Sequence, residues 1–269
     1  MSVFDYIKWS PKLTRMIYNL LYCRIANRQK CTNQDALLKL KDLRNIHKDK
    51  RCFIIGTGPS LTISDLELLT NEITFAPNRI FEILQKTEWR PTYYVCQDHD
   101  IINKFSDKIT SISAKIKFLP VEYRSRFVGD EYRYFVLKEN DYYPHDAKFS
   151  VDISNHISQG YTVTYGAIQI AVYMGFKEIY LIGIDHNYSI VRDSSGRPVK
   201  LTDSKNYSEN MMEYINLKNL PRIEESTIAY ETAEKITRKK GVKIFNATRG
   251  GKLEAFERID LDKLFCINE

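Results

Sequence analysis

The chain has 269 residues, of which 43% are hydrophobic and 28% charged, and a formal net charge of +6. This composition is that of an ordinary globular domain and excludes collagen-like and disordered chains. No run approaches the roughly 18 apolar residues of a membrane span, and residues 1–27 lack the pattern of a secretory signal, so we expect a cytoplasmic protein. The five cysteines form no CxxC pair and predict neither a disulfide framework nor a zinc site. The positive charge suits an anionic ligand or membrane surface but is too mild and evenly spread to predict a nucleic-acid partner.

Residues 1–50 have a helical pattern without a strand and are expected to form an N-terminal extension. Apolar residues fall at near-helical spacing among basic ones, at Leu13, Ile17, Leu20, Leu21 and Ile25. Such a helix could touch a membrane surface through residues 1–30, pack on a partner subunit, or pack on the edge of its own domain. A second amphipathic helix is expected over residues 36–46.

The stretch Arg51–Leu61 organises the rest of the chain. Three apolar residues, Phe53–Ile55, lead into Gly56-Thr57-Gly58-Pro59-Ser60, which predicts a buried parallel strand followed by a sharp turn. A helix capped by Ser60, Thr62 or Ser64 should follow, with Asp65 in its first turn. A strand, a glycine turn and a helix start can hold a phosphate, but this spacing is neither GxGxxG nor a Walker loop. A purely structural turn explains it equally well.

Strands and helices then alternate, which predicts an α/β fold with a Rossmann-like, doubly wound, mostly parallel sheet. Further strands are expected at 72–76, 91–96, 115–119, 132–137, 177–185 and 242–246, and helices at 64–69, 80–86, 164–174 and 223–240, with Gly175 ending the third. Residues 140–159 have no clear period and predict an ordered loop. Residues 51–269 would form one nucleotide-binding domain, with a lid insertion at about 188–222, where apolar residues are few. Because ligands bind beyond the carboxyl ends of parallel strands, Gly56–Ser60, Asn78, Gln97 and Asp98 should share one edge of the sheet.

Several blocks resemble a family named MptE-like, after a 6-hydroxymethylpterin diphosphokinase. The resemblance spans roughly residues 40–265, and the blocks are Phe53–Leu61, Pro77-Asn78-Arg79, Gly160–Tyr165, Met174–Asp185 and Asn246–Phe256. The same blocks are similar to those of small bacterial sialyltransferases that use CMP-sialic acid. The resemblance implies a sialyltransferase-like fold, a variant of the GT-A type, and a role in surface-polysaccharide biosynthesis.

The resemblance also implies a role for each matched residue. The turn residues Gly56, Thr57, Gly58, Pro59 and Ser60 would hold the donor's phosphate and ribose, Asn78 would contact the phosphate and leaving group, and Gln97 or Asp98 the ribose or base. Thr162 and Thr164 would face the phosphate or sugar carboxylate, and Asp185 would stand near the cytidine. Tyr188 and Tyr207 would stabilise the departing phosphate. Arg79 could clamp a phosphate or form a buried ion pair.

One departure concerns the catalytic base. The sialyltransferases carry a His in the lid, whereas this chain has Lys205-Asn206-Tyr207 there and no His after residue 186. Either His186 takes the role, because imidazole accepts a proton near neutral pH, or another base or none is used. His186 could instead be bound to a carbonyl or stacked beneath the nucleotide. The cluster Asp98-His99-Asp100 looks like a metal-binding or acid–base set. The similar sialyltransferases work without metal, so their resemblance implies no metal site.

Three functions are therefore predicted. The first is a glycosyltransferase that moves a CMP-activated, sialic acid-like sugar to a glycan acceptor without a cofactor. The second is a pterin diphosphokinase, which would need Mg²⁺ to bridge ATP phosphates. The third is a non-catalytic nucleotide-binding subunit, which the missing lid His favours. We also expect a homo-oligomer, with peripheral contact to the inner face of a membrane.

Overall fold

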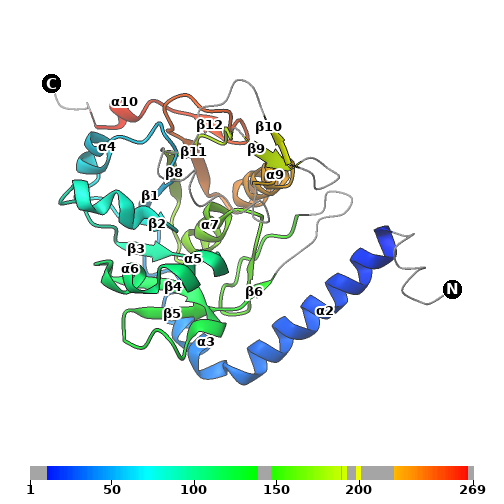
Figure 1. Cartoon of the computed structure of the whole chain (residues 1–269). Helices are drawn as coiled ribbons and strands as arrows, with labels where there is room; N and C mark the ends of the chain where they lie inside the picture. Colours follow the sequence, from blue (N-terminus) through cyan, green and yellow to red (C-terminus); the bar gives the residue numbers. More distant parts are fainter. Residues whose placement is uncertain (1–10, 139–146, 189, 193–197, 201–220, 266–269) are drawn as a thin grey trace.

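A parallel sheet of eight strands forms the centre of the molecule, in the order β12-β11-β8-β1-β2-β3-β4-β5 (Figure 1). The computed structural model describes residues 11–138, 147–188, 190–192, 198–200 and 221–265. Every strand pair of this sheet is parallel. The strands are β1 (Arg51–Ile55), β2 (Thr74–Pro77), β3 (Tyr93–Val95), β4 (Ile116–Pro120), β5 (Tyr132–Phe135), β8 (Glu178–Ile182), β11 (Lys243–Asn246) and β12 (Glu257–Arg258). The α/β, doubly wound, Rossmann-like fold is confirmed.

Helices cover both faces of the sheet, as expected for strands that are buried on both sides. One face packs against α3 (Gln34–Lys41), α7 (Val163–Tyr173) and α9 (Ile223–Lys239). The other packs against α4 (Ile63–Leu68), α5 (His99–Lys104), α6 (Ser106–Ser111), α10 (Leu261–Phe265) and the 3-10 turn Ile80–Glu82. Strand β1 shows the division, because Cys52 and Ile54 point into the first core and Phe53 and Ile55 into the second. Three layers result.

Local sequence signals set the ends of two helices next to the central strands. Thr62 caps α4 in a capping box, in which its side chain accepts from the amide of Asp65 and the Asp65 carboxylate accepts from the amide of Thr62. At the end of α7, Gly175 has a φ of +93°, and its amide donates to the carbonyl of Val172. Both signals were readable from the sequence.

Some elements differ from the expected ones. Residues 80–86 form two 3-10 turns, Ile80–Glu82 and Leu84–Lys86, in place of a helix. The helix expected at 36–46 ends at Lys41, and turns follow it. Within the stretch expected to be loop, β7 (Ile157–Ser158) pairs with β6 (Leu137–Lys138). Helices α5 and α6 were not predicted, because each has only six residues and no clear apolar period.

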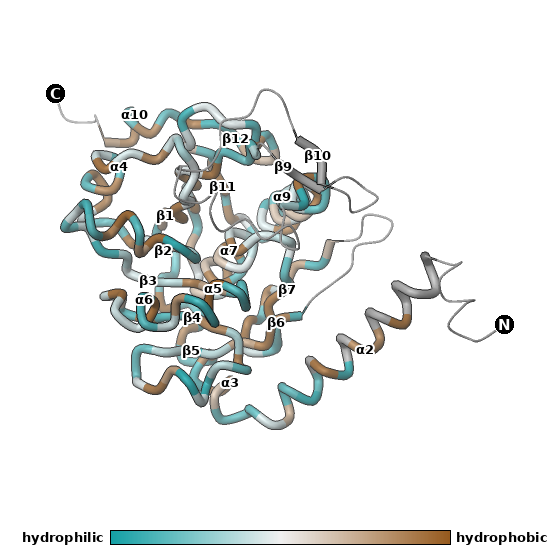
Figure 2. Tube along the Cα trace, viewed as in Figure 1, coloured by the Kyte–Doolittle hydropathy of each residue, from teal (hydrophilic) through white to brown (hydrophobic). Residues whose placement is uncertain are grey.

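The first described helix, α2 (Pro11–Thr32), stands apart from the layered body (Figure 1). Its last turns are tied down by hydrogen bonds from Gln29 to Glu122 and from Lys30 to Asn155. Leu20, Leu21 and Ile25 are exposed, so this part of α2 does not pack on the edge of its own domain. Figure 2 shows hydrophobic positions along this helix interleaved with hydrophilic ones. None of the described helices is both long enough and apolar enough to cross a membrane.

Most of the predicted lid lies outside the described residues. Two short strands at its start, β9 (Ile190–Arg192) and β10 (Pro198–Lys200), pair in an antiparallel hairpin.

Candidate functional site

The order of the strands reverses between β1 and β8. From β1 the chain adds β2 to β5 on one side, and it then returns to place β8, β11 and β12 on the other. In open α/β sheets such a switch point opens a crevice at the carboxyl ends of the two strands, where ligands bind. We call the residues that follow these ends and those of β2 and β3 the switch-point rim, which comprises Gly56–Ser60, Asn78, Gln97, Asp185 and His186. All of these residues were predicted from the sequence.

The turn Gly56–Ser60 is bound closely to the loop after β8. The Gly56 amide donates to the Ile182 carbonyl at 2.7 Å, and the Gly58 amide to the Gly183 carbonyl at 2.9 Å. A Cβ on Gly58 would lie 1.9 Å from the Asp185 carboxylate, and one on Gly56 would lie 2.2 Å from the Gly183 carbonyl. Both glycines are therefore required for the close approach of two loops, whatever ligand binds beside them.

Asp185 is bound within this contact. Its Oδ2 accepts from the Ser60 hydroxyl at 2.7 Å and from the Ser60 amide at 3.4 Å. Its backbone carbonyl accepts from the Lys252 amide at 2.8 Å. Pro59 is exposed and Thr57 half-buried. Asp185 thus locks the turn to the end of β8, and the outer part of the turn, Thr57 and Pro59, is the part open to a ligand.

Asn78 and Gln97 have buried oxygen atoms without a partner. Among the residues that the structure describes, neither Oδ1 of Asn78 nor Oε1 of Gln97 has a hydrogen-bond partner. Asn78 also has a φ of +45°, an uncommon conformation for a residue other than glycine. Gln97 lies against Gly166 of α7, where a Cβ would come within 2.8 Å of its Oε1. Since buried polar atoms are almost always paired, two unpaired ones on adjacent strand ends indicate a place for a ligand.

Two predicted binding residues, Asp98 and Arg79, bind other groups of the protein. Asp98 caps α5, and its Oδ1 accepts from the amides of Asp100 and Ile101 at 2.9 and 3.1 Å. Arg79 is buried, pairs with Glu82 (Nε to Oε1, 3.1 Å) and lies over the ring of Phe105. Of the two interpretations of Arg79, the structure shows the buried ion pair.

The start of α7 brings hydroxyl groups to the same side of the sheet. Thr162 is the N-cap residue of this helix, and Thr164 is buried in its first turn. The Thr162 hydroxyl lies 3.3 Å from that of Tyr230 on α9. Burial raises the pKa of the Tyr230 phenol, so it stays protonated and available as a donor. A helix start with hydroxyl groups beside it is suited to a phosphate or carboxylate.

His186 is held in one orientation by α9. It is 7% exposed, has a φ of +49°, and its Nε2 lies 2.7 Å from the Thr227 hydroxyl. That hydroxyl has a single proton and also lies 2.8 Å from the Ile223 carbonyl, which can only accept. The hydroxyl therefore donates to Ile223 and accepts from His186, which places the imidazole proton on Nε2. Nδ1 is then the atom that can accept a proton.

The surroundings of His186 keep the ring neutral. Its edge meets the rings of Tyr188 and Tyr230 at centroid distances of 6.3 and 5.6 Å. Burial lowers the pKa of His186 to about 4. A bound anion beside the ring would raise this pKa again, because an opposite charge favours the imidazolium.

Three residues of this region were not predicted: Thr227 and Tyr230 of α9, and Asn187, whose buried Oδ1 has no partner among the described residues. Asn187 follows His186 and could have been noted at a strand end. Thr227 and Tyr230 carry no local signal, because they look like ordinary positions of an amphipathic helix. Of the predicted residues, Tyr207 lies outside the described part of the chain.

Comparison with known protein families identifies the family of this chain. Residues 28–191, more than half of the chain, match the family described as 6-hydroxymethylpterin diphosphokinase MptE-like. The chain belongs to this family. No curated protein is similar enough in sequence to match it.

The fold of this MptE-like chain is also similar to that of a solved glycosyltransferase. The structure of the MAf glycosyltransferase from Magnetospirillum magneticum AMB-1 aligns with 85% of this chain at a TM-score of 0.50 and 15% sequence identity. The MptE-like chain spans only 38% of that longer chain. At this identity the similarity concerns the fold alone.

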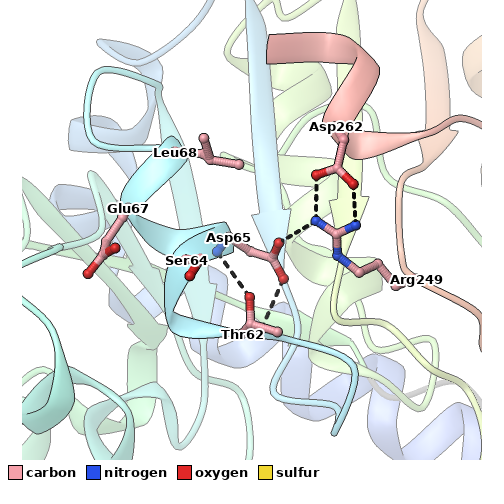
Figure 3. A pocket seen from close by; sticks show the side chains of 7 residues that line it. All are labelled: Thr62, Ser64, Asp65, Glu67, Leu68, Arg249 and Asp262. Carbon is pink, nitrogen blue, oxygen red and sulfur yellow. Dashed lines mark hydrogen bonds and ion pairs between the residues drawn. The ribbon is translucent and has the colours of Figure 1, made fainter. Parts of the chain in front are cut away.

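A hollow of about 560 Å³ lies outside the rim, between α4, α10 and the loop after β11 (Figure 3). Arg249 lines it, and its guanidinium donates to Asp65 at 2.8 Å and to both oxygens of Asp262 at 2.6 and 2.7 Å. These two carboxylates raise the pKa of Arg249. With both carboxylates engaged, Arg249 links α4 to α10.

Divalent metal would need carboxylates at the rim. In the part of the MptE-like chain that the structure describes, no group of three or more His, Cys, Asp or Glu side chains is placed to hold a metal ion. His99, from the cluster that resembled a metal set, has its Nδ1 2.9 Å from the Tyr123 hydroxyl.

Proposed function

We propose that this chain is a glycosyltransferase that moves an acidic, sialic acid-like sugar from a CMP donor to a glycan acceptor. The observation that carries the proposal is the set of buried polar atoms, on Asn78, Gln97 and Asn187 at the ends of β2, β3 and β8, that have no partner among the described residues. They lie where a nucleotide binds in folds of this type. The similarity of the fold to a glycosyltransferase supports the reaction class.

The rim residues divide into binding and reacting groups. Asn78 Oδ1 and Gln97 Oε1 would accept hydrogen bonds from the ribose hydroxyls or the base amino group of the donor, beside the outer part of the Gly56–Ser60 turn. The helix start at Thr162 and Thr164 would stabilise the negative charge of the phosphate or of the sugar carboxylate. Tyr188 and Tyr207 would donate hydrogen bonds to the departing phosphate.

The reaction exchanges one bond at the sugar for another. The bond between the anomeric carbon and the phosphate oxygen breaks, and CMP leaves with the electron pair. A bond to the acceptor hydroxyl oxygen forms, and its proton passes to Nδ1 of His186. The nearby phosphate raises the pKa of His186 from about 4 toward its ordinary value, so the donor itself would strengthen the base.

A second candidate, a pterin diphosphokinase that uses Mg²⁺ and ATP, is favoured by the activity after which the family is named. Its metal would need free carboxylate oxygens at the rim. Of the two carboxylates that follow β8 and β3, Asp185 binds Ser60 through Oδ2 and Asp98 caps α5 through Oδ1, so one oxygen of each is already engaged. The third candidate, a non-catalytic nucleotide-binding subunit, needs only the binding groups.

Thermal-shift titration with CMP, CDP, ATP and GTP, each with and without Mg²⁺, tests the proposal. We expect CMP and CDP at about 100 times their Kd to raise the Tm by roughly 5 °C or more without metal. A shift only with Mg²⁺ and ATP would overturn the proposal in favour of the diphosphokinase.

The variant His186→Ala should still bind CMP but lose at least about 100-fold in transfer. Full transfer by this variant would remove His186 as the base, and binding without any transfer by the native chain would support the third candidate.

A further inference from the structure

Helix α2 presents apolar and basic side chains that its own domain does not cover. Leu20, Leu21 and Ile25 are 57%, 51% and 52% exposed, and Arg24 and Arg28 beside them are exposed as well. We call these five residues the α2 patch. Their spacings of three and four residues place them on one side of the helix. The helix has 22 residues, so it is about 33 Å long.

The charge of α2 has a single sign. Residues 11–32 contain five Lys and Arg residues and no Asp or Glu. A helix with apolar residues next to cations and no compensating acids is suited to the interface of an anionic bilayer, where the side chains of Arg24 and Arg28 can reach the headgroups.

The same charge argues against a second copy of the chain as the occupant. Pairing two α2 helices through the α2 patch would bring Arg24 and Arg28 of one copy to those of the other, and α2 has no carboxylate to offset them. The domain's own surface is excluded for this part of the helix because the three apolar side chains are exposed. Charge complementarity therefore selects an anionic surface.

We propose that α2 docks this protein on an anionic lipid surface through the α2 patch. Leu20, Leu21 and Ile25 enter the boundary between headgroups and acyl chains, and the arginines bind lipid phosphates. This inference does not depend on the proposed reaction, because it concerns a helix that stands apart from the switch-point rim (Figure 1).

Co-sedimentation of the full chain with vesicles tests the docking. The probes are vesicles of phosphatidylcholine alone and vesicles with one part in three of phosphatidylglycerol. We expect binding to the anionic vesicles only, weakened by NaCl because the charges lie at the surface. Leu20→Gln/Leu21→Gln/Ile25→Gln and Arg24→Gln/Arg28→Gln should each bind at least roughly tenfold more weakly. Gln keeps the helix propensity of the replaced residues.

Val128→Gln is the matched control, because Val128 is an exposed apolar residue, 82% exposed, that lies outside α2. It should bind the vesicles as the native chain does. Failure of the native chain to bind anionic vesicles, or equal binding to both vesicle types, would overturn the proposal. So would a dimer in light scattering that the Leu/Ile variant converts to monomer. Sugar transfer to a soluble acceptor should be unchanged in the Leu/Ile variant and in the Arg variant. The vesicle experiment can therefore fail while the proposed reaction stands, and the reverse.

Discussion

Two parts of the switch-point rim differ in whether their polar groups have hydrogen-bond partners within the protein. The glycine turn is hydrogen-bonded within the protein, because the amides of Gly56 and Gly58 donate to the carbonyls of Ile182 and Gly183, and the Ser60 hydroxyl donates to Asp185. On the neighbouring strands, the buried oxygens of Asn78 and Gln97 have no partner among the described residues. The Gly56–Ser60 turn, which most resembles a ligand-binding loop, thus serves mainly to hold β1 against the loop after β8.

This difference separates groups that contribute to folding stability from groups that could contribute to ligand binding. Hydrogen bonds inside the turn stabilise the contact between β1 and β8. An unpaired buried oxygen costs roughly 1–3 kcal/mol of folding stability, which a ligand donor can recover on binding. Residues of the first kind should therefore affect stability when replaced, and residues of the second kind should affect binding.

Replacement of Gly58 by Ala should give the largest effect and tests the first half of this comparison. The new Cβ would lie 1.9 Å from the Asp185 carboxylate and 2.7 Å from the Gly183 carbonyl. We expect a loss of about 3 kcal/mol or more in the free energy of unfolding, because both loops must separate. Urea denaturation followed by circular dichroism measures it.

Gly250→Ala is the control for Gly58→Ala. Gly250 has no atom within 4 Å of its Cβ position but has a φ of +69°. It should cost only the roughly 1–2 kcal/mol of a left-handed residue with a side chain. Equal losses in the two variants would mean that the close approach to Asp185 is not what requires glycine in the turn.

His186 should make the protein sensitive to acid. Burial lowers the pKa of His186 in the folded state to about 4, whereas its pKa in the unfolded chain is near 6.5. Between pH 4 and 6.5 the unfolded state therefore binds a proton that the folded state does not. The free energy of unfolding should fall by up to about 3 kcal/mol as the pH decreases from 6.5 to 4. His186→Gln should remove that part of the pH dependence, which urea titrations at several pH values would show.

The control is His156, whose pKa burial also lowers to about 4, outside the switch-point rim. His156→Gln should reduce the acid sensitivity in the same direction and leave CMP binding and transfer unchanged. If saturating CMP does not raise the pH at which His186 titrates in an NMR experiment, the ring does not lie beside the donor phosphate.

The fold could be predicted from the sequence because its main signals are local. The apolar runs Phe53–Ile55 and Ile179–Ile182 are buried, Thr62 caps the start of α4, and Gly175 follows the end of α7, as expected. The short helices α5 and α6 and the 3-10 turns were missed or misassigned because their forms depend on packing against the sheet rather than on propensity.

The candidate site could be predicted only in part. Asn78, Gln97 and Asp185 were found because each follows a strand, and the parallel sheet brings such residues together. Whether each was free or engaged could not be predicted, since the partners of Asp185 and Arg79 depend on side-chain geometry. Thr227, which fixes the tautomer of His186, lies 41 residues away in the chain and had no signal of its own.

Asn78→Gly should have the smallest effect on stability and tests the second half of the comparison. Glycine accepts the φ of +45° without strain, and its introduction removes the unpaired oxygen. We expect the free energy of unfolding to change by less than about 1 kcal/mol, because strain relief offsets the added entropy of the unfolded chain. Binding of CMP, measured by calorimetry, should weaken about tenfold. Asn45→Gly is the matched control, since Asn45 also has a positive φ, of +58°, but lies in the turns after α3. It should bind CMP as the native chain does, and equal affinities in all three proteins would show that Asn78 Oδ1 is not a ligand group.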